Sequence, residues 1–313
     1  MVILIVNFLS LFINVALSFE NGSELRTFKS SNIPVSTVTT IKDECFETFR
    51  IVGGKPAIIE EAPYQVSIRT YLSADWKTNV HCGGSLISAK AVLSAGHCFG
   101  RKAQSVNPRL YLVVLGSAHR IWQSTSSHRR GVRLVTVHPR FRMAPTVQHD
   151  LALVMMDRDA SETSSIQLVA LPVKPVTEET ICIVTGWGRQ DFYEVRKPTC
   201  LMKAIIPVLN LAECRKRQTI PIADGFICAG FFEGGIDACT GDSGGPLVCN
   251  GVQYGIVSYG KACAEPNHPG LYTDVYHYVD WIRREVDRNG SNLKLLSFCT
   301  ILLTVAIRLL IEV

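Results

Sequence analysis

The chain has 313 residues, 47% of them hydrophobic and 19% charged, with a formal net charge of +5. This composition argues against general disorder, and the length allows one large β domain or two domains of ordinary size. No DNA- or RNA-binding motif accompanies the modest positive charge, so no nucleic-acid partner is expected. Eleven cysteines in a chain with a secretory leader indicate disulfides and an oxidising compartment.

The first 18 residues predict that leader. They are almost wholly apolar and end in Ala16-Leu17-Ser18, although they lack the usual positive charge at their start. We expect cleavage before Phe19, with an uncleaved membrane anchor as the alternative. Residues 19–50 are polar and show no sustained helical or strand period. We expect them to form an extended propeptide, or light chain.

Short β-branched and apolar runs follow, separated by clusters of Gly, Pro, Asn and Ser, which is typical of an antiparallel barrel or sandwich. The predicted strands cover residues 65–71, 84–87, 110–115, 132–137, 151–156, 180–186, 204–209 and 252–259. Residues 157–180 begin polar and then carry Pro172 and Pro175, so they are the expected boundary between two halves.

An apolar spacing of three and four residues predicts a helix over about residues 274–288, with Thr273 as its N-cap. We expect this helix to bury one stripe of side chains against the second half of the domain. The stripe consists of Val275, Tyr278, Val279, Ile282 and Val286.

Residues 289–313 combine small polar residues with an apolar run of 19 residues that starts at Leu295. This arrangement resembles a GPI-attachment signal, although its polar spacer is short and Arg308 lies near the end. A retained membrane segment is the alternative, since the run is only just long enough to span a bilayer. We therefore expect an extracellular protein anchored at the cell surface. N-glycosylation sequons begin at Asn21 and Asn289.

Four motifs occur in a fixed order along the chain: Ile51-Val-Gly-Gly54, Ser94-Ala-Gly-His97-Cys98, His149-Asp150-Leu-Ala-Leu-Val154 and Gly241-Asp242-Ser243-Gly-Gly245-Pro246. Any one of them alone could be a turn, a structural histidine or the end of a strand. Together they resemble chymotrypsin-family (trypsin-like) serine proteases over residues 51–288, and with the apolar tail they resemble the membrane-anchored members. The resemblance implies an all-β fold of two antiparallel six-stranded β-barrels and a C-terminal helix, with the active site between the barrels.

The resemblance also implies a catalytic triad. A serine is a poor nucleophile at neutral pH unless a base takes its proton and a third group orients that base. Ser243 is the implied nucleophile, His97 the implied base and Asp150 the implied orienting carboxylate. The backbone N–H groups of Gly241 and Ser243 are the implied oxyanion hole, which stabilises the negative charge of the tetrahedral intermediate.

Asp237 lies six residues before Ser243, where the family has the base of its primary pocket. A carboxylate there implies cleavage after Arg or Lys, and Ala238 beside it tilts the preference toward Arg. A solvated Asp237 is the alternative. Tyr259 stands in place of the family's common Trp on the strand that pairs with the substrate. The implied substrate-binding residues are Asp237, Ala238, Ser258, Tyr259, Gly260 and Gly270.

Arg50-Ile51 resembles the family's activation site. Cleavage after Arg50 would free the Ile51 amine to fold inward and pair with Asp242, which would otherwise be a costly unpaired charge. The activating enzyme would be another trypsin-like protease or this protein itself, because Arg50 is a basic cleavage point.

Eight cysteines correspond to bridges of the family: Cys82–Cys98, Cys182–Cys249, Cys214–Cys228 and Cys239–Cys263. Cys45 and Cys200 remain in the extracellular part, and we expect them to link the propeptide to the catalytic domain. Cys299 lies in the apolar tail.

No cofactor or metal is expected. Disulfides suit His81-Cys82 and His97-Cys98 better than zinc does, and the loop 117–132 has no carboxylate for calcium. That loop and its flank are basic, which indicates either a solvated face or a site for an anionic substrate or cofactor. The basic residues are His119, Arg120, His128, Arg129, Arg130 and Arg133.

The competing hypothesis is a catalytically silent protease homologue that acts as a binding protein. Such proteins usually lack a triad residue, and none is lost here. Departures from the family pattern are mild, since Ser94 and Gly96 stand where Thr and Ala are usual and both are small. The expected partners are protein or peptide substrates with Arg or Lys at the cleavage site, an activating protease, protein inhibitors and, through the anchor, a membrane.

Overall fold

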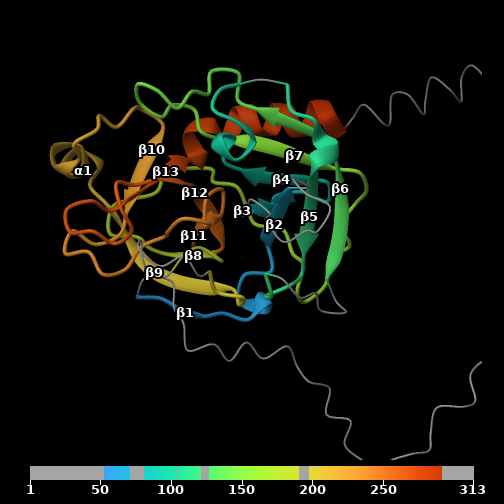
Figure 1. Ribbon diagram of the computed structural model, residues 1–313, viewed down its shortest axis with the longest axis horizontal. Coiled ribbons are helices and arrows are strands. Elements are labelled where there is room, and N and C mark those ends of the chain that lie inside the picture. The colour runs from blue at the N-terminus through green and yellow to red at the C-terminus, as the bar shows by residue number, and fades with distance from the viewer. Residues whose placement is uncertain (1–52, 71–80, 104, 121–126, 190–196, 291–313) are drawn as a thin grey trace, which may run out of the picture. The chain divides into compact units, whose positions relative to one another are not determined.

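The computed structural model describes residues 53–70, 81–103, 105–120, 127–189 and 197–290, all within one compact unit. They form two antiparallel β-barrels, which lie side by side in Figure 1. The predicted leader, the propeptide with Cys45, Arg50 and Ile51, and the tail from residue 291 lie outside the described residues. Within the described ranges, no helix is long and apolar enough to cross a membrane.

The first barrel closes in the strand order β2-β3-β4-β7-β6-β5. Apolar side chains that alternate along these strands fill its interior, including Val66, Ile68 and Val154. Its strands are β2 (Gln65–Thr70), β3 (His81–Leu86), β4 (Ala91–Ser94), β5 (Tyr111–Leu115), β6 (His128–Val137) and β7 (Ala152–Met156). Short 3-10 helices η1 (Ile59–Glu61), η2 (Gly96–Phe99) and η3 (Pro108–Leu110) connect the chain around it.

The second barrel closes through the pairing of β8 with β9, and β1 (Lys55–Pro56) extends it beside β9. Val184, Ile206 and Leu247 are among its buried core residues. Its strands are β8 (Ile181–Gly186), β9 (Met202–Leu209), β10 (Phe226–Ala229), β11 (Pro246–Cys249), β12 (Val252–Tyr259) and β13 (Gly270–Asp274). Helix α1 (Leu211–Arg217) follows β9. Its N-cap is Asn210, whose side chain accepts a hydrogen bond from Glu213 N.

The expected two-barrel fold is therefore confirmed, and residues 157–180 connect the barrels as predicted. Each predicted strand is present, with ends that differ by up to four residues. Strands β1, β4, β10, β11 and β13 were not predicted. They have two to five residues each, and at that length a strand shows little alternation.

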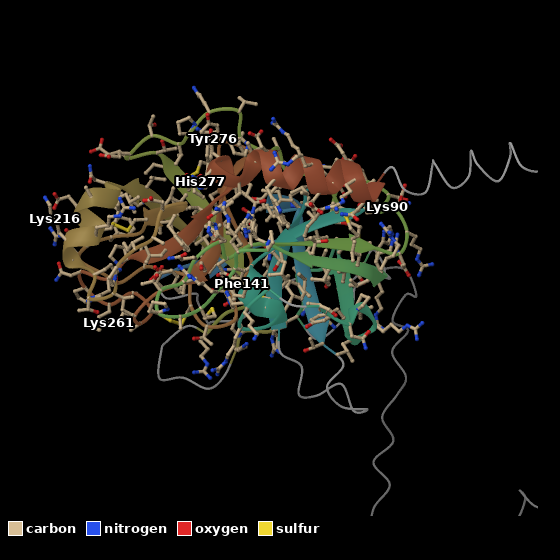
Figure 2. The ribbon with its side chains drawn as sticks, turned by 90° about the horizontal axis from the view of Figure 1, so that it is seen from above. Lys90, Phe141, Lys216, Lys261, Tyr276 and His277 are labelled. Atoms are coloured by element: carbon tan, nitrogen blue, oxygen red, sulfur yellow. A yellow bond between two sulfur atoms is a disulfide. The ribbon has the colours of Figure 1, made fainter. Side chains whose placement is uncertain are left out.

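The C-terminal helix covers residues 275–290 and packs differently from our prediction. Val275, Tyr278 and Ile282 are buried, and they pack with Leu93 and Leu151 at one side of the first barrel as well as with Ile256 of β12. Figure 2 labels Tyr276 and His277 near the start of this helix and Lys90, which precedes β4, near its far end. The prediction was incomplete, because the helix also covers the apolar outer faces of β4 and β7 in the first barrel.

The N-cap of this helix is also one residue later than predicted. Asp274 Oδ1 accepts hydrogen bonds from Tyr276 N at 2.9 Å and His277 N at 3.4 Å. Thr273 instead belongs to β13, and its Oγ1 donates to the Asp150 carbonyl at 2.7 Å. The expected cap residue therefore stabilises the region of the candidate active site.

Buried polar pairs join the two barrels. Ser85 Oγ of β3 donates to Gln253 Oε1 of β12 at 2.5 Å, and Thr185 Oγ1 of β8 donates to Gln65 Oε1 of β2 at 2.6 Å. Gly83 N also donates to the carbonyl of Ser243 at 2.8 Å. A buried polar group that has lost its hydrogen-bond partner lowers the stability of the folded protein. These bonds therefore favour one arrangement of the two barrels.

The Thr185–Gln65 bond can be tested by removing one partner or both. Thr185→Val keeps the shape but leaves Gln65 Oε1 buried and unpaired, which we expect to cost about 1–3 kcal/mol of unfolding free energy. The double variant Thr185→Val/Gln65→Met removes both polar groups and should regain most of that loss. Thermal unfolding monitored by circular dichroism measures both. A double variant less stable than Thr185→Val would contradict the assignment.

Candidate active site

The register of the first barrel brings His97 and Asp150 together. Strands β4 and β7 are antiparallel, with Ser94 opposite Ala152, so the residues just after β4 meet those just before β7. His97 N donates to Asp150 Oδ1 at 2.8 Å, and His97 Nδ1 lies 2.7 Å from Asp150 Oδ2. Two residues that are far apart in sequence thus form a pair with two hydrogen bonds.

Asp150 is fully buried, and two residues of the second barrel hold it in place. Ser258 Oγ donates to Asp150 Oδ2, and Thr273 Oγ1 donates to the Asp150 carbonyl oxygen. Strands β12 and β13 therefore help to orient a carboxylate that belongs to the first barrel. The sequence predicted Ser258 as a substrate-binding residue and Thr273 as a helix N-cap, and it predicted no contact of either with Asp150.

Asp150 and His97 each stabilise the charged form of the other. Burial alone would raise the pKa of Asp150, but the charge and hydrogen bonds of His97 and the hydroxyl of Ser258 lower it below its usual value. Burial would lower the pKa of His97, yet the charge and the hydrogen bond of Asp150 raise it. An ionised Asp150 accepts a hydrogen bond from Nδ1–H of a neutral His97, which leaves Nε2 free to accept a proton.

Gly96 and Ser94 pack tightly beneath the histidine. A Cβ atom on Gly96 would lie 3.1 Å from Phe141 Cγ and 3.3 Å from Asp150 Oδ1. Phe141, labelled near the middle of Figure 2, therefore occupies the space that an alanine would need. Ser94 Oγ donates to Gly83 O at 2.8 Å.

The turn that carries Ser243 lies against the first barrel. The carbonyl oxygen of Ser243 accepts the hydrogen bond from Gly83 N and lies 3.8 Å from Sγ of Cys98, the residue that follows His97. Gly244 has φ +80°, and a Cβ atom there would lie only 2.3 Å from Ser94 Oγ, so a larger residue cannot occupy the turn. Ser243 Oγ makes no hydrogen bond to His97 in this structure, and such bonds commonly tighten only when substrate is bound.

The predicted oxyanion hole has the expected backbone. Gly241 has φ +112°, and a Cβ atom there would lie 2.8 Å from Lys197 Nζ and 3.1 Å from Gly188 Cα. Among the described residues, the backbone N–H groups of Gly241 and Ser243 have no acceptor. Both groups are therefore available to a ligand oxygen.

A pocket of about 200 Å³ lies beside Ser243, between residues 237–240 and the end of β12. Asp237 is 2% exposed at this pocket, and its carboxylate accepts from Ala238 N at 2.8 Å and Ala264 N at 3.3 Å. Burial raises the pKa of Asp237 to about 7, although these two backbone bonds oppose the shift. An ionised Asp237 would therefore be stabilised by a cation that enters the pocket.

Ser258, Tyr259, Gly260 and Gly270 line this pocket together with Asp237, and Tyr259 of β12 pairs with Leu271 of β13. A Cβ atom on Gly270 would lie 2.6 Å from Asp237 Oδ1, so only glycine leaves the carboxylate accessible. At Gly260 the nearest atom would be 3.6 Å away, which permits a side chain. Tyr259 is half-buried and contacts Phe226 edge-on at 5.4 Å.

Asp242 is buried behind the oxyanion turn. Its carboxylate accepts from Gly188 N at 2.7 Å and Cys239 N at 2.9 Å, and a Cβ atom on Gly186 or Gly188 would collide with it. Burial raises the pKa of Asp242 to about 6, with Lys197 a minor opposing influence. No Lys, Arg or His of the described ranges lies within ion-pair distance of Asp242.

A family model described as Trypsin matches residues 51–282. The chain belongs to the trypsin family of serine proteases. Trypsin of Sus scrofa is 35% identical over 241 residues, which cover 77% of this chain and 97% of that protein. Trypsin I-P1 of Gallus gallus is 36% identical over 258 residues, covering 82% and 96%. Trypsin II-P29 of the same organism is 37% identical over 238 residues, covering 76% and 89%.

Family membership supports a hydrolase that acts on protein substrates and that protein inhibitors can block. The predicted likeness to the membrane-anchored members stays a prediction. The four expected disulfides are confirmed as Cys82–Cys98, Cys182–Cys249, Cys214–Cys228 and Cys239–Cys263. Cys200 is also disulfide-bonded, and its predicted partner Cys45 lies outside the described residues.

Sequence reasoning missed three residues near the site. Thr273 was predicted to cap a helix, and Gly188 and Lys197 were given no role. Lys197 follows a polar stretch with no recognisable period, so nothing in the sequence placed it beside Gly241. Only the folded chain brings these positions to the site, and the motif signals were confined to short contiguous segments.

The coupling between Asp150 and His97 makes a measurable prediction. In an Asp150→Asn variant the lowering effect of burial remains, but the raising effect of the carboxylate is lost. The pKa of His97 should therefore fall below the usual value of histidine. NMR titration of its imidazole nitrogens measures this, with Asp224→Asn, at an exposed residue, as the control. An unchanged pKa of His97 in Asp150→Asn would show that the pair does not set its basicity.

Proposed function

We propose that this protein is a serine endopeptidase that cleaves peptide bonds after Arg, or Lys, and becomes active when its own chain is cut after Arg50. One observation carries the proposal. Ser243 and the buried carboxylate of Asp237 line the same pocket, beside two available backbone N–H groups. A nucleophile, an anion-binding turn and a counter-charge for a basic side chain therefore lie within reach of one substrate residue.

In the proposed reaction, Ser243 Oγ attacks the substrate carbonyl carbon while His97 Nε2 takes its proton. The carbonyl oxygen becomes negative and accepts from the N–H groups of Gly241 and Ser243. His97 then gives the proton to the nitrogen of the breaking C–N bond, and the amine leaves. A water molecule attacks the acyl-serine by the same route, which releases the acid and restores Ser243.

Specificity in this proposal comes from Asp237. With the pocket empty, burial raises the pKa of Asp237 to about 7, so burial opposes ionisation of this carboxylate. A guanidinium offers an opposite charge and paired donors, which favours the ionised form. Ala238 contributes only its backbone N–H to Asp237, so no hydroxyl is available there for a shorter lysine.

Activation in this proposal comes from Asp242. A buried carboxylate with two backbone donors and no cation partner in the described chain is poised to accept a charged amine. The Ile51 amine would be such a cation. Gly53, two residues later, already lies against the loop before Asp237, since a Cβ atom there would be 2.5 Å from Gly235 O.

The remaining parts of the proposal rest on sequence. A leader over residues 1–18, a light chain held by Cys45–Cys200 and a GPI-attachment signal in residues 289–313 would produce a glycosylated, surface-anchored enzyme. Asn21 lies outside the described residues. Asn289 is buried and its Nδ2 donates to Glu285 O at 2.8 Å, so glycan attachment there would require the helix end to open.

The alternative, a silent homologue, is separated from an enzyme by covalent labelling. After cleavage at Arg50, an arginyl phosphonate should label Ser243, and Ser243→Ala should lose both label and about six orders of magnitude in kcat. Asp237→Ser should lose labelling by the arginyl phosphonate but keep labelling by a fluorophosphonate without a basic group. A variant Asp237→Ser that still cleaves after Arg would refute the specificity assignment.

The activation mechanism predicts that an Arg50→Gln chain stays inactive toward arginyl amides, because no amine is released to pair with Asp242. For the cleaved enzyme, activity should fall at alkaline pH as the Ile51 amine loses its proton. An α-amine usually does so near pH 8, and an ion pair with Asp242 would move the loss to higher pH. Full activity of uncleaved Arg50→Gln would contradict the mechanism.

A further inference from the structure

Lys197 lies directly against the oxyanion turn. Its Nζ and Cε are 2.8 and 3.1 Å from the point where a Cβ atom of Gly241 would be. The residue is half-buried, and no described residue accepts a hydrogen bond or forms an ion pair with its ammonium group. The carboxylate of Asp242 lies nearby and accepts from Gly188 N and Cys239 N, but it forms no ion pair with Lys197.

Two arginines, Arg120 and Arg189, add positive charge near the ammonium group of Lys197. Arg120 N donates to Thr199 O at 2.6 Å and Arg120 Nε donates to Pro198 O at 3.0 Å, which ties its loop to the segment of Lys197. Arg189 N donates to Thr240 O at 2.9 Å, and its Nε is buried without a hydrogen-bond partner. Burial and then Arg120 lower the pKa of Lys197, and Arg189 adds to this.

The position of this cluster fits one part of a substrate. In the proposed reaction, the residue before the scissile bond enters the pocket of Asp237, and the preceding residues run along residues 258–260. Gly241 is not part of the pocket lining. Since Gly241 N–H is proposed to bind the carbonyl oxygen at the scissile bond, we expect the residues after that bond to run past Gly241 and its neighbour Lys197.

Resting on the proposed function, we propose that Lys197, with Arg189 and Arg120 behind it, binds a substrate carboxylate within the first three residues after the scissile bond. The enzyme thereby prefers substrates with Asp or Glu there. A carboxylate would relieve the repulsion among partly desolvated cations, which favours it over a neutral side chain. The activation sequence after Arg50, Ile51-Val-Gly-Gly54, has no acid. The site therefore favours other proteins over this chain as substrates.

The test uses quenched fluorescent peptides that are identical up to Arg and carry Asp or Asn in the second position after it. The cleaved enzyme should show a kcat/KM for the Asp peptide about fivefold that for the Asn peptide. Lys197→Gln should bring this ratio close to one, and Lys197→Glu should instead favour a peptide with Lys there. The matched control Lys174→Gln changes an exposed lysine away from the site and should keep the ratio.

Raising the salt concentration should reduce the ratio of the parent enzyme and leave that of Lys197→Gln unchanged. A tripeptide arginyl amide has no amino acid after the scissile bond, so it reports the proposed function alone. If the parent cleaves this amide but shows equal rates for the two peptides, the carboxylate site is overturned and the proposed function stands. If the parent cleaves neither the amide nor the peptides, both proposals fail.

Discussion

The ionised carboxylate of Asp150 is the constraint on which the arrangement of both barrels depends. A buried charge is costly unless hydrogen bonds and an opposite charge replace its water. His97 supplies two of these bonds from η2, and Ser258 supplies another from β12. Thr273 of β13 fixes the backbone of the same residue. The two barrels thus have to meet in one way if Asp150 is to stay ionised.

In the part of the chain that the structure describes, three buried carboxylates show two different solutions to the same cost. Asp150 finds its partner within the described fold, and its pKa is lowered. Asp237 and Asp242 receive only backbone N–H groups, and burial raises their pKa to about 7 and about 6. In the proposed function each of these two receives a cation from elsewhere, from the substrate and from the new chain terminus. In that proposal, the lack of a cation partner would determine substrate specificity at Asp237 and activation at Asp242.

The sequence predicted those parts of the fold and site that are encoded in contiguous segments. His97 and Ser243 lie within recognisable motifs, the resemblance that those motifs carry implied the four disulfides, and the longer strands show clear alternation. The short strands β4, β10, β11 and β13 carry too few residues for a period to be visible.

Partners were harder to predict than positions. The stripe of the C-terminal helix was recognised as buried, but its spacing contains no information about which barrel it covers. Leu93 and Leu151 decide this, because they face away from the interior of the first barrel and need a cover. The same limit applies to Thr273, whose hydroxyl could cap a helix or bind Asp150. Only the packing of β13 beside Asp150 selects between them.

If both proposals hold, activation is electrostatically linked to recognition of the substrate residues after the scissile bond. Among the described residues, burial and then Arg120 lower the pKa of Lys197, Asp242 raises it, and Arg189 lowers it further. Once the Ile51 amine pairs with Asp242, that negative charge is balanced and no longer offsets the repulsion between Lys197 and the arginines. The cluster then gains more from a substrate carboxylate than it does in the uncleaved chain. Cleavage after Arg50 would thus strengthen the acidic preference beside the oxyanion hole as it completes the hole itself.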